Sequence, residues 1–129
     1  AVQHEASKAW LEAALSGTEI VRLPWPTVWA FLRISTSPMV FEHPLSITEA
    51  IAAVSSWLER SNAGVLDPGE RHWEILQRLL EEAQCTGALV TDAALAALAI
   101  EHGATLCTTD RDFSRFPELA WLNPLMEAR

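Results

Sequence analysis

Three aspartates in the C-terminal part of the chain have residue types and surroundings suited to a metal site. Asp92 follows Thr91 at the expected start of a helix whose next residues, AALAALAI, are apolar on every side, as in a fully buried helix. Asp110 ends the run ATLCTT, which lacks alternation and favours a strand covered on both faces. Asp112 follows in the same TTDRDF segment. Because ligands of open α/β sheets bind outside the carboxyl ends of the strands, we expect Asp92 and Asp110 to face one crevice.

Carboxylates grouped in this way suit Mg²⁺ or Mn²⁺, since these hard ions take oxygen ligands and keep several waters. The competing interpretation is structural, with Asp92 as a helix N-cap and Asp110 as a turn residue. An N-cap needs no second acid, whereas TTDRDF places Asp110 and Asp112 beside hydroxyls and an arginine at the expected ligand crevice. The sequence therefore favours a divalent metal site over two unrelated structural roles.

Helices alternate with short strands along the rest of the chain, an order typical of a layered α/β fold with a parallel sheet. Ser46 and Glu49 have the form of a capping box, and Asp67 followed by Pro68 predicts a second helix start. A helix around Ile75–Leu80 follows that second start. The other expected elements are helices over 4–15, 27–36 and 47–61 and strands over 19–23, 65–66 and 120–122.

Composition limits the classes of protein that the chain can represent. With 129 residues, half of them hydrophobic, it is the size of one domain, which we place over 1–129. A net charge of −8 argues against a general basic surface for nucleic acid, but not against phosphodiester chemistry at a metal, and it suits a basic partner. No apolar run reaches the roughly 18 residues of a membrane span and no signal peptide is evident, so we expect a cytoplasmic protein. Cys85 and Cys107 are expected to be free, buried thiols.

Apolar side chains of the helix over 27–36 are expected to lie in the core rather than in a cofactor site. Six tryptophans leave a second possibility open, because Trp25, Trp29 and Trp57 suit either a core or a groove for a protein partner. Arg33 is the single charge of this helix. It is explained equally by a solvated side chain and by a phosphate contact or internal ion pair. The residues expected in the core are Val28, Trp29, Phe31, Leu32 and Ile34.

The segment TDAALAALAIEHGATLCTTDRDFSRF resembles the C-terminal half of a PIN domain. LPWPTVWAFLRISTSPMVF resembles the VapC branch of that family, the toxins of VapBC toxin–antitoxin pairs. The specific part of the match is T-D-x-x-L-A-x-L-A-x-x-x-G-A-x-L-x-T-x-D-x-D-F, whereas the upstream half matches mainly by its order of elements. The resemblance implies a PIN-like three-layer α/β/α sandwich with a short parallel sheet. It also implies a Mg²⁺-dependent endoribonuclease, usually homodimeric, that a small VapB-like antitoxin keeps inactive.

Carried over by position, the resemblance makes Asp92 the catalytic acid at the helix start and Asp110 the catalytic acid after the strand. Both would also hold the Mg²⁺ or Mn²⁺ ion, and Asp112 would be a nearby catalytic auxiliary. Arg111, Arg115 and Arg33 are candidates for contacts with the RNA backbone, with solvated or paired arginines as the alternative. No separate organic cofactor is implied.

Two features depart from the family pattern. The family's first acid lies on an N-terminal strand in a D-x-N or D-x-S context, and the sequence shows no such strand before its first predicted helix. The family's glutamate would fall near Ala30, where the chain has no acid. A catalytically impaired PIN-fold module that mainly binds an antitoxin or another protein is therefore the alternative function. A phosphatase on another α/β fold is a weaker alternative, because no nucleophilic-aspartate motif is visible.

Overall fold

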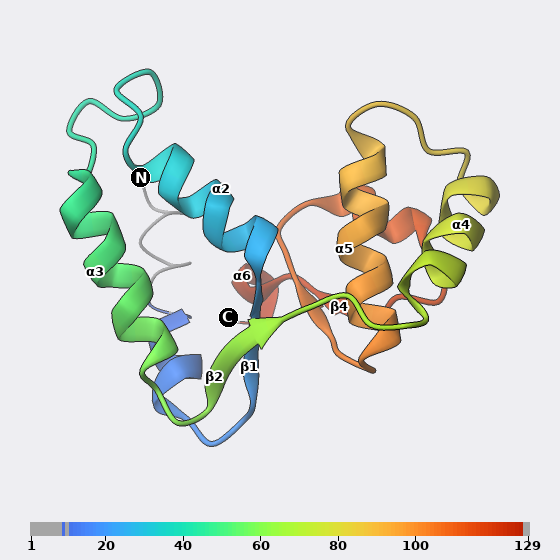
Figure 1. Ribbon diagram of the computed structural model, residues 1–129, viewed down its shortest axis with the longest axis horizontal. Helices are drawn as coiled ribbons and strands as arrows, with labels where there is room; N and C mark the ends of the chain where they lie inside the picture. Colours follow the sequence, from blue (N-terminus) through green and yellow to red (C-terminus); the bar gives the residue numbers. More distant parts are fainter. Residues whose placement is uncertain (1–8, 10, 128–129) are drawn as a thin grey trace. The chain divides into compact units, whose positions relative to one another are not determined.

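The computed structural model describes residue 9 and residues 11–127, which fall into two compact units (Figure 1). Unit 1 contains residue 9 and residues 68–127, and unit 2 contains residues 11–67. Of the helix predicted over 4–15, residues 4–8 and 10 lie outside the described residues, while residues 9 and 11–16 are helical. Among the described helices, none combines the length and the apolar character that a bilayer crossing requires.

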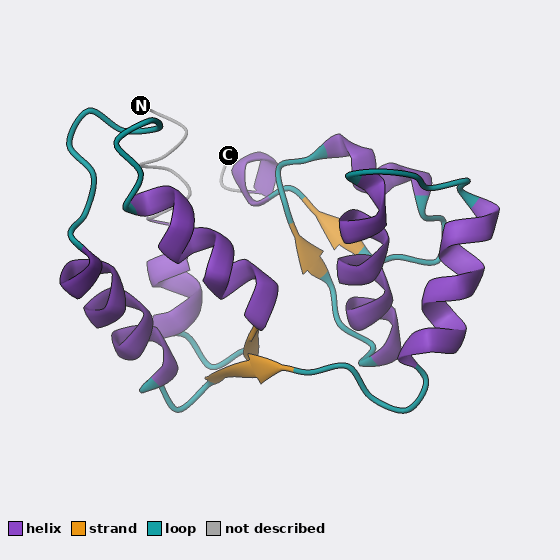
Figure 2. Cartoon of the chain, turned by 45° about the horizontal axis from the view of Figure 1, so that its top comes forward, coloured by secondary structure: helices purple, strands orange, loops and turns teal. Residues whose placement is uncertain are grey.

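Unit 2 is built on a pair of parallel strands with two helices between them in sequence (Figure 2). The first helix follows the first strand directly, because Pro26 fits the first turn of a helix, where its missing N–H costs no hydrogen bond. Residues Val21 and Ala63 are partners in the strand register. The elements are β1 (Val21–Pro24), α2 (Trp25–Ser35), α3 (Ile47–Leu58) and β2 (Ala63–Leu66).

The predicted capping box starts α3 and is confirmed. The Ser46 hydroxyl accepts from the Glu49 N–H at 3.1 Å, and the Glu49 carboxylate accepts from the Ser46 N–H at 2.9 Å. Two otherwise free donors at the helix start are thereby satisfied. Asn62 stabilises the chain before β1 in a similar way, since its side-chain amide donates to the carbonyl oxygens of Ala14 at 3.1 Å and Glu19 at 2.9 Å.

Helix α2 is less buried than the sequence predicted. Val28 is buried, but Trp29 is 61% exposed and Ile34 is 39% exposed, so their assignment to the core is wrong. Phe31 meets Trp57 edge to face with ring centroids 4.7 Å apart, which buries the other side of α2 against α3. The small unit cannot cover both faces of its helices, and large apolar side chains stay exposed. Those on α2 and α3 are Trp25, Trp29, Ile34, Ile47 and Ile51.

Unit 1 places a helical pair beside a second pair of parallel strands. Parallel pairing of the short strands was predicted and is confirmed in both units. The expected buried strand over ATLCTT is much shorter, however, and Cys107 is exposed rather than buried, while Cys85 is buried as expected. The elements are α4 (His72–Glu82), α5 (Leu89–Glu101), β3 (Leu106–Cys107), the 3₁₀ helix η1 (Arg111–Arg115), β4 (Trp121–Leu122) and α6 (Pro124–Glu127).

Helix α5 is the centre of unit 1 and is buried round most of its circumference, as its sequence predicted. Alanines on several faces let α4 and η1 approach closely, because an alanine side chain fills little space. Gly103, with φ of 62°, ends the helix in the left-handed conformation that glycine adopts without strain. The shared core contains Ile75, Leu79, Ala93, Ala96, Ala97, Ala99, Phe113, Phe116 and Leu119.

The start of α4 differs from the prediction. The helix begins at His72, and Arg71 rather than Asp67 precedes it, without a side-chain cap, so the predicted cap is wrong. Glu101, the last residue of α5, instead stabilises the loop before the helix: its carboxylate accepts from the N–H groups of Gly69 at 2.9 Å and Arg71 at 3.0 Å. A distant carboxylate thus fixes the chain at the start of α4, where no local side chain caps the helix.

Candidate metal centre

Asp92 lies in the first turn of α5 and is half-buried. The helix begins three residues earlier than the sequence suggested, at Leu89, after an Ala88 that provides no side-chain cap. Asp92 is therefore not an N-cap, and that structural interpretation is wrong. In the part of the chain that the structure describes, no N–H or O–H group donates to the Asp92 carboxylate. Its position in the helix is accounted for by neither capping nor hydrogen bonding.

Asp110 and Asp112 are placed by a tight turn that leads into η1. The Asp110 carboxylate accepts from the Asp112 N–H at 2.8 Å and so caps η1, while the Asp110 N–H donates to the Thr108 hydroxyl at 3.1 Å. These bonds stabilise the turn locally. Phe113 and Phe116, both buried, anchor the segment to the core beside α5. The turn is consequently fixed at both ends.

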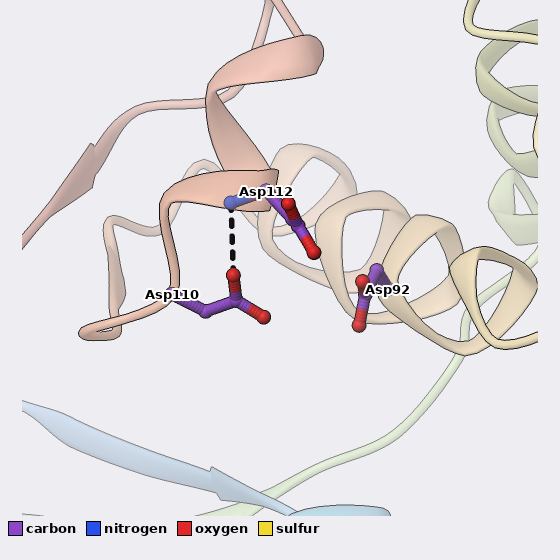
Figure 3. Close-up of side chains that lie close together, drawn as sticks. All are labelled: Asp92, Asp110 and Asp112. Carbon is purple, nitrogen blue, oxygen red and sulfur yellow. Dashed lines mark hydrogen bonds between the residues drawn. The ribbon is translucent and has the colours of Figure 1, made fainter.

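Packing of η1 on α5 brings the three aspartates together (Figure 3). Carboxylate oxygens from Asp92, Asp110 and Asp112 all lie within 4.8 Å of one another. We call these three residues the acid cluster. Oxygens spaced in this way can share one divalent cation, and the exposure of Asp110 and Asp112 leaves room for the waters that such an ion retains.

The electrostatics of the acid cluster are unfavourable for three bare carboxylates. Burial raises the pKa of Asp92 above its ordinary value, and the negative charges of Asp110 and Asp112 raise it further. Arg115 acts in the opposite direction. The positive end of a helix favours a negative charge, but burial and like charges have the larger effect on the pKa of Asp92. A bound cation would reverse that balance, and the acid cluster could bind one.

The arginines predicted to contact RNA lie in both units. Arg111 and Arg115 belong to η1, and Arg33 lies in the last turn of α2. The Arg115 side chain is directed at the acid cluster, because its Nε donates to the Asp112 carbonyl at 2.9 Å. Sequence analysis gave a paired arginine as one alternative for Arg115 but did not identify Asp112 as its partner. The three-residue spacing of Asp112 and Arg115 would have revealed it, since residues so spaced are neighbours on a helix.

Comparisons with known proteins identify relatives along almost the whole chain. A family model described as a PIN domain matches residues 1–119. Ribonuclease VapC33 of Mycobacterium tuberculosis is 39% identical over 125 residues, which are 97% of this chain and 87% of that protein. Ribonuclease VapC37 of the same species is 40% identical over 121 residues, 94% of this chain and 84% of that protein.

Two solved structures share the fold at low sequence identity. The crystal structure of VapBC2 from Rickettsia felis, bound to a promoter DNA fragment, matches with a TM-score of 0.65 and 20% identity, covering 92% of this chain and 85% of that one. The structure of VapBC-1 from nontypeable Haemophilus influenzae matches with a TM-score of 0.66 and 18% identity, covering 90% and 85%.

Proposed function

We propose that this chain, which belongs to the PIN domain family and to its VapC branch, is a metal-dependent endoribonuclease and the toxin of a toxin–antitoxin pair. Family membership confirms the resemblance inferred from the sequence, together with an α/β fold of short parallel strands. The observation that carries the proposed activity is the acid cluster, in which three carboxylates from two elements meet within 4.8 Å.

The residues present fit a divalent ion. Their donor atoms are carboxylate oxygens, which Mg²⁺ and Mn²⁺ prefer, and a half-buried Asp92 with a raised pKa gains from a nearby positive charge. We assign Asp92 and Asp110 as the residues that hold the ion, directly or through water. An ion bound there would supply positive charge for the phosphate oxygens and for activation of the attacking water.

The remaining roles belong to Asp112 and to three arginines. Asp112 is assigned as the auxiliary acid, exposed and next to Asp110, where it can accept a proton or orient a water molecule. Arg111, exposed at the start of η1, is assigned to the RNA backbone, as are Arg33 and Arg115. Phosphate contacts of this kind would position the RNA without selecting a base sequence.

A VapB-like antitoxin is the proposed partner. The structural neighbours are VapBC assemblies, and helices α2 and α3 expose Trp25, Trp29, Ile47 and Ile51. Exposed aromatic and aliphatic side chains are typical anchors of protein interfaces. A net charge of −8 favours a basic partner, whose encounter with this chain would be accelerated by charge. We also propose a homodimer and a cytoplasmic location.

The proposed activity is tested by incubating structured RNA with the natural full-length protein, freed of antitoxin. Cleavage is expected with Mg²⁺ or Mn²⁺ and not with a chelator. Cleavage that continues in chelator would exclude the metal-dependent mechanism. The alternative, an impaired PIN-fold module, is favoured by the absence of an acid near Ala30. It predicts tight antitoxin binding by a protein that leaves RNA intact under every metal condition.

A further inference from the structure

Arg115 is a cation that the chain itself places beside the acid cluster. Its Nε donates to the Asp112 carbonyl at 2.9 Å, and its Nη2 lies 3.6 Å from an Asp112 carboxylate oxygen. We propose that Arg115 is a positioning residue whose charge offsets the repulsion within the acid cluster when no metal ion is bound. A divalent ion would take over that role on binding. The inference rests on the proposed metal site.

The contact alone would be a weak surface ion pair, since the Asp112 and Arg115 side chains are 55% and 32% exposed. The surroundings of the Asp112–Arg115 contact make it more important than an isolated surface pair. Asp112 shares its location with two further carboxylates, so the guanidinium faces a concentrated negative charge. The charge of Arg115 acts beyond Asp112, because carboxylate oxygens of Asp110 and of Asp92, on the neighbouring helix α5, lie within 4.8 Å of one of Asp112.

Arg115 and a bound metal ion would act on the same negative charges. Both cations stabilise the same negative cluster, so each should reduce the energetic contribution of the other. Without metal, loss of Arg115 leaves the three carboxylates unopposed and should lower stability. With metal bound, loss of Arg115 should cost little, and it should increase affinity for the ion by removing a repulsive charge.

Thermal melting of Arg115→Gln in chelator and in saturating Mn²⁺ tests this prediction. In chelator the melting temperature should fall by about 2 °C relative to the wild type. Mn²⁺ should raise the variant's melting temperature more than that of the wild type and close the gap. Calorimetry should show Mn²⁺ binding several-fold more tightly to Arg115→Gln. Arg115→Lys, which keeps the charge, should restore most of the wild-type behaviour.

Arg111→Gln is the matched control. Arg111 is exposed on the same 3₁₀ helix, and within the described residues it has no ion pair with the acid cluster. Its replacement removes one positive charge without changing the contact to Asp112. The dependence of the melting temperature on Mn²⁺ should therefore stay close to that of the wild type. If Arg111→Gln and Arg115→Gln had equal effects, the change in net charge alone would explain them, and the proposal would be overturned.

A double-mutant cycle in chelator separates this inference from the proposed function. If Arg115 offsets repulsion, its replacement should lower the melting temperature less in an Asp92→Asn background, where one of the three negative charges has been removed. The cycle needs no metal, so it still tests Arg115 if Mn²⁺ fails to shift the wild type, a result that would contradict only the metal site. An identical cost of Arg115→Gln with and without Asp92 would show a purely local structural role and overturn the inference.

Discussion

The two ends of helix α5 carry acidic residues in opposite circumstances. At the C-terminal end, Glu101 accepts two backbone N–H bonds, at 2.9 and 3.0 Å, and the bond from Gly69 is the main reason its pKa is lowered. Near the N-terminal end, Asp92 has no donor among the described residues and faces two other carboxylates. Its pKa is raised, first by burial.

The difference separates a structural acid from a candidate functional one. Glu101 is satisfied by the chain, so its charge contributes to folding. Asp92 is ionised at some cost to folding, which Arg115 opposes in part and a bound cation would reduce further. An acid that the fold leaves without a partner, beside two others, is a stronger indication of a cation site than the number of acids alone.

The largest expected effect is on activity. Asp92→Asn should reduce RNA cleavage by at least about 100-fold and weaken Mg²⁺ binding, because the site loses a formal charge that a hard ion requires. The fold should be kept, since asparagine is nearly the same size. In chelator the melting temperature should stay the same or rise slightly. Cleavage rates and Mn²⁺ calorimetry measure the two effects together.

Glu101→Gln is the control at the other end of α5. It should leave cleavage and Mn²⁺ affinity near wild type, since Glu101 bonds to Gly69 and Arg71 rather than to the acid cluster. If both variants lost activity equally, the contrast between the two ends would be wrong.

For stability, the larger loss should come from replacing Glu101 rather than Asp92. Glu101→Ala leaves the N–H groups of Gly69 and Arg71 without their acceptor, so the melting temperature should fall by several degrees, more than in Asp92→Asn. Differential scanning calorimetry measures this fall. A melting temperature equal to that of the wild type would mean that water replaces the carboxylate at no cost.

Gly69→Ala tests the same contact of Glu101 and should lower the melting temperature less than Glu101→Ala does. A methyl group at Gly69 would lie 2.5 Å from a Glu101 carboxylate oxygen, so the flexible Glu101 side chain must move and its bonds weaken. A decrease in melting temperature smaller than that of Glu101→Ala is expected. Combined with Glu101→Ala, the substitution should add almost nothing, because the displaced group is already gone. Full additivity of the two decreases would contradict this account.

The smallest effect is the pH dependence of stability without metal, and the two acids give it opposite signs. Glu101 has a folded-state pKa below its ordinary 4.5, so its contribution is present above that value and is lost as pH falls through the lowered pKa. Asp92 has a folded-state pKa above its ordinary 3.8, so stability decreases as pH rises from that value through the raised pKa.

Melting temperatures measured against pH in chelator test both signs. Glu101→Gln should remove the loss of stability as pH falls below 4.5, and Asp92→Asn should remove the decline as pH rises above 3.8. If the decline above 3.8 persisted in Asp92→Asn, the raised pKa of Asp92 would be wrong.

Sequence analysis located several elements correctly because their signals are local. Ser46 and Glu49 specify a cap within four residues, and the alanine-rich run before Gly103 specifies a buried helix and its end. It misplaced the start of α4, because Glu101 acts from a distant part of the chain. Exposure of Trp29 and Cys107 was missed for a related reason: an apolar side chain does not show whether a unit is large enough to cover it.

The proximity of Asp92 to Asp110 was expected from the sequence, since one opens a helix and the other follows a strand. A turn role for Asp110 was the competing interpretation, and Asp110 does cap η1; its partner, the Asp112 N–H, was not predicted because that bond depends on the exact backbone path into η1. The roles assigned to the three acids and to Arg33, Arg111 and Arg115 stay predictions.

The alanines of α5 also determine how easily the site could be lost through mutation. Ala93, Ala96 and Ala97 are fully buried where α5 meets α4 and η1, so any larger side chain must push those elements apart. Ala93 stands next to Asp92, and Phe113 next to Asp112, so a displacement of η1 would separate the carboxylates directly. The tight packing at these alanines thus constrains the acid cluster as strictly as the acids do: a related chain could retain all three aspartates and still lose their spacing.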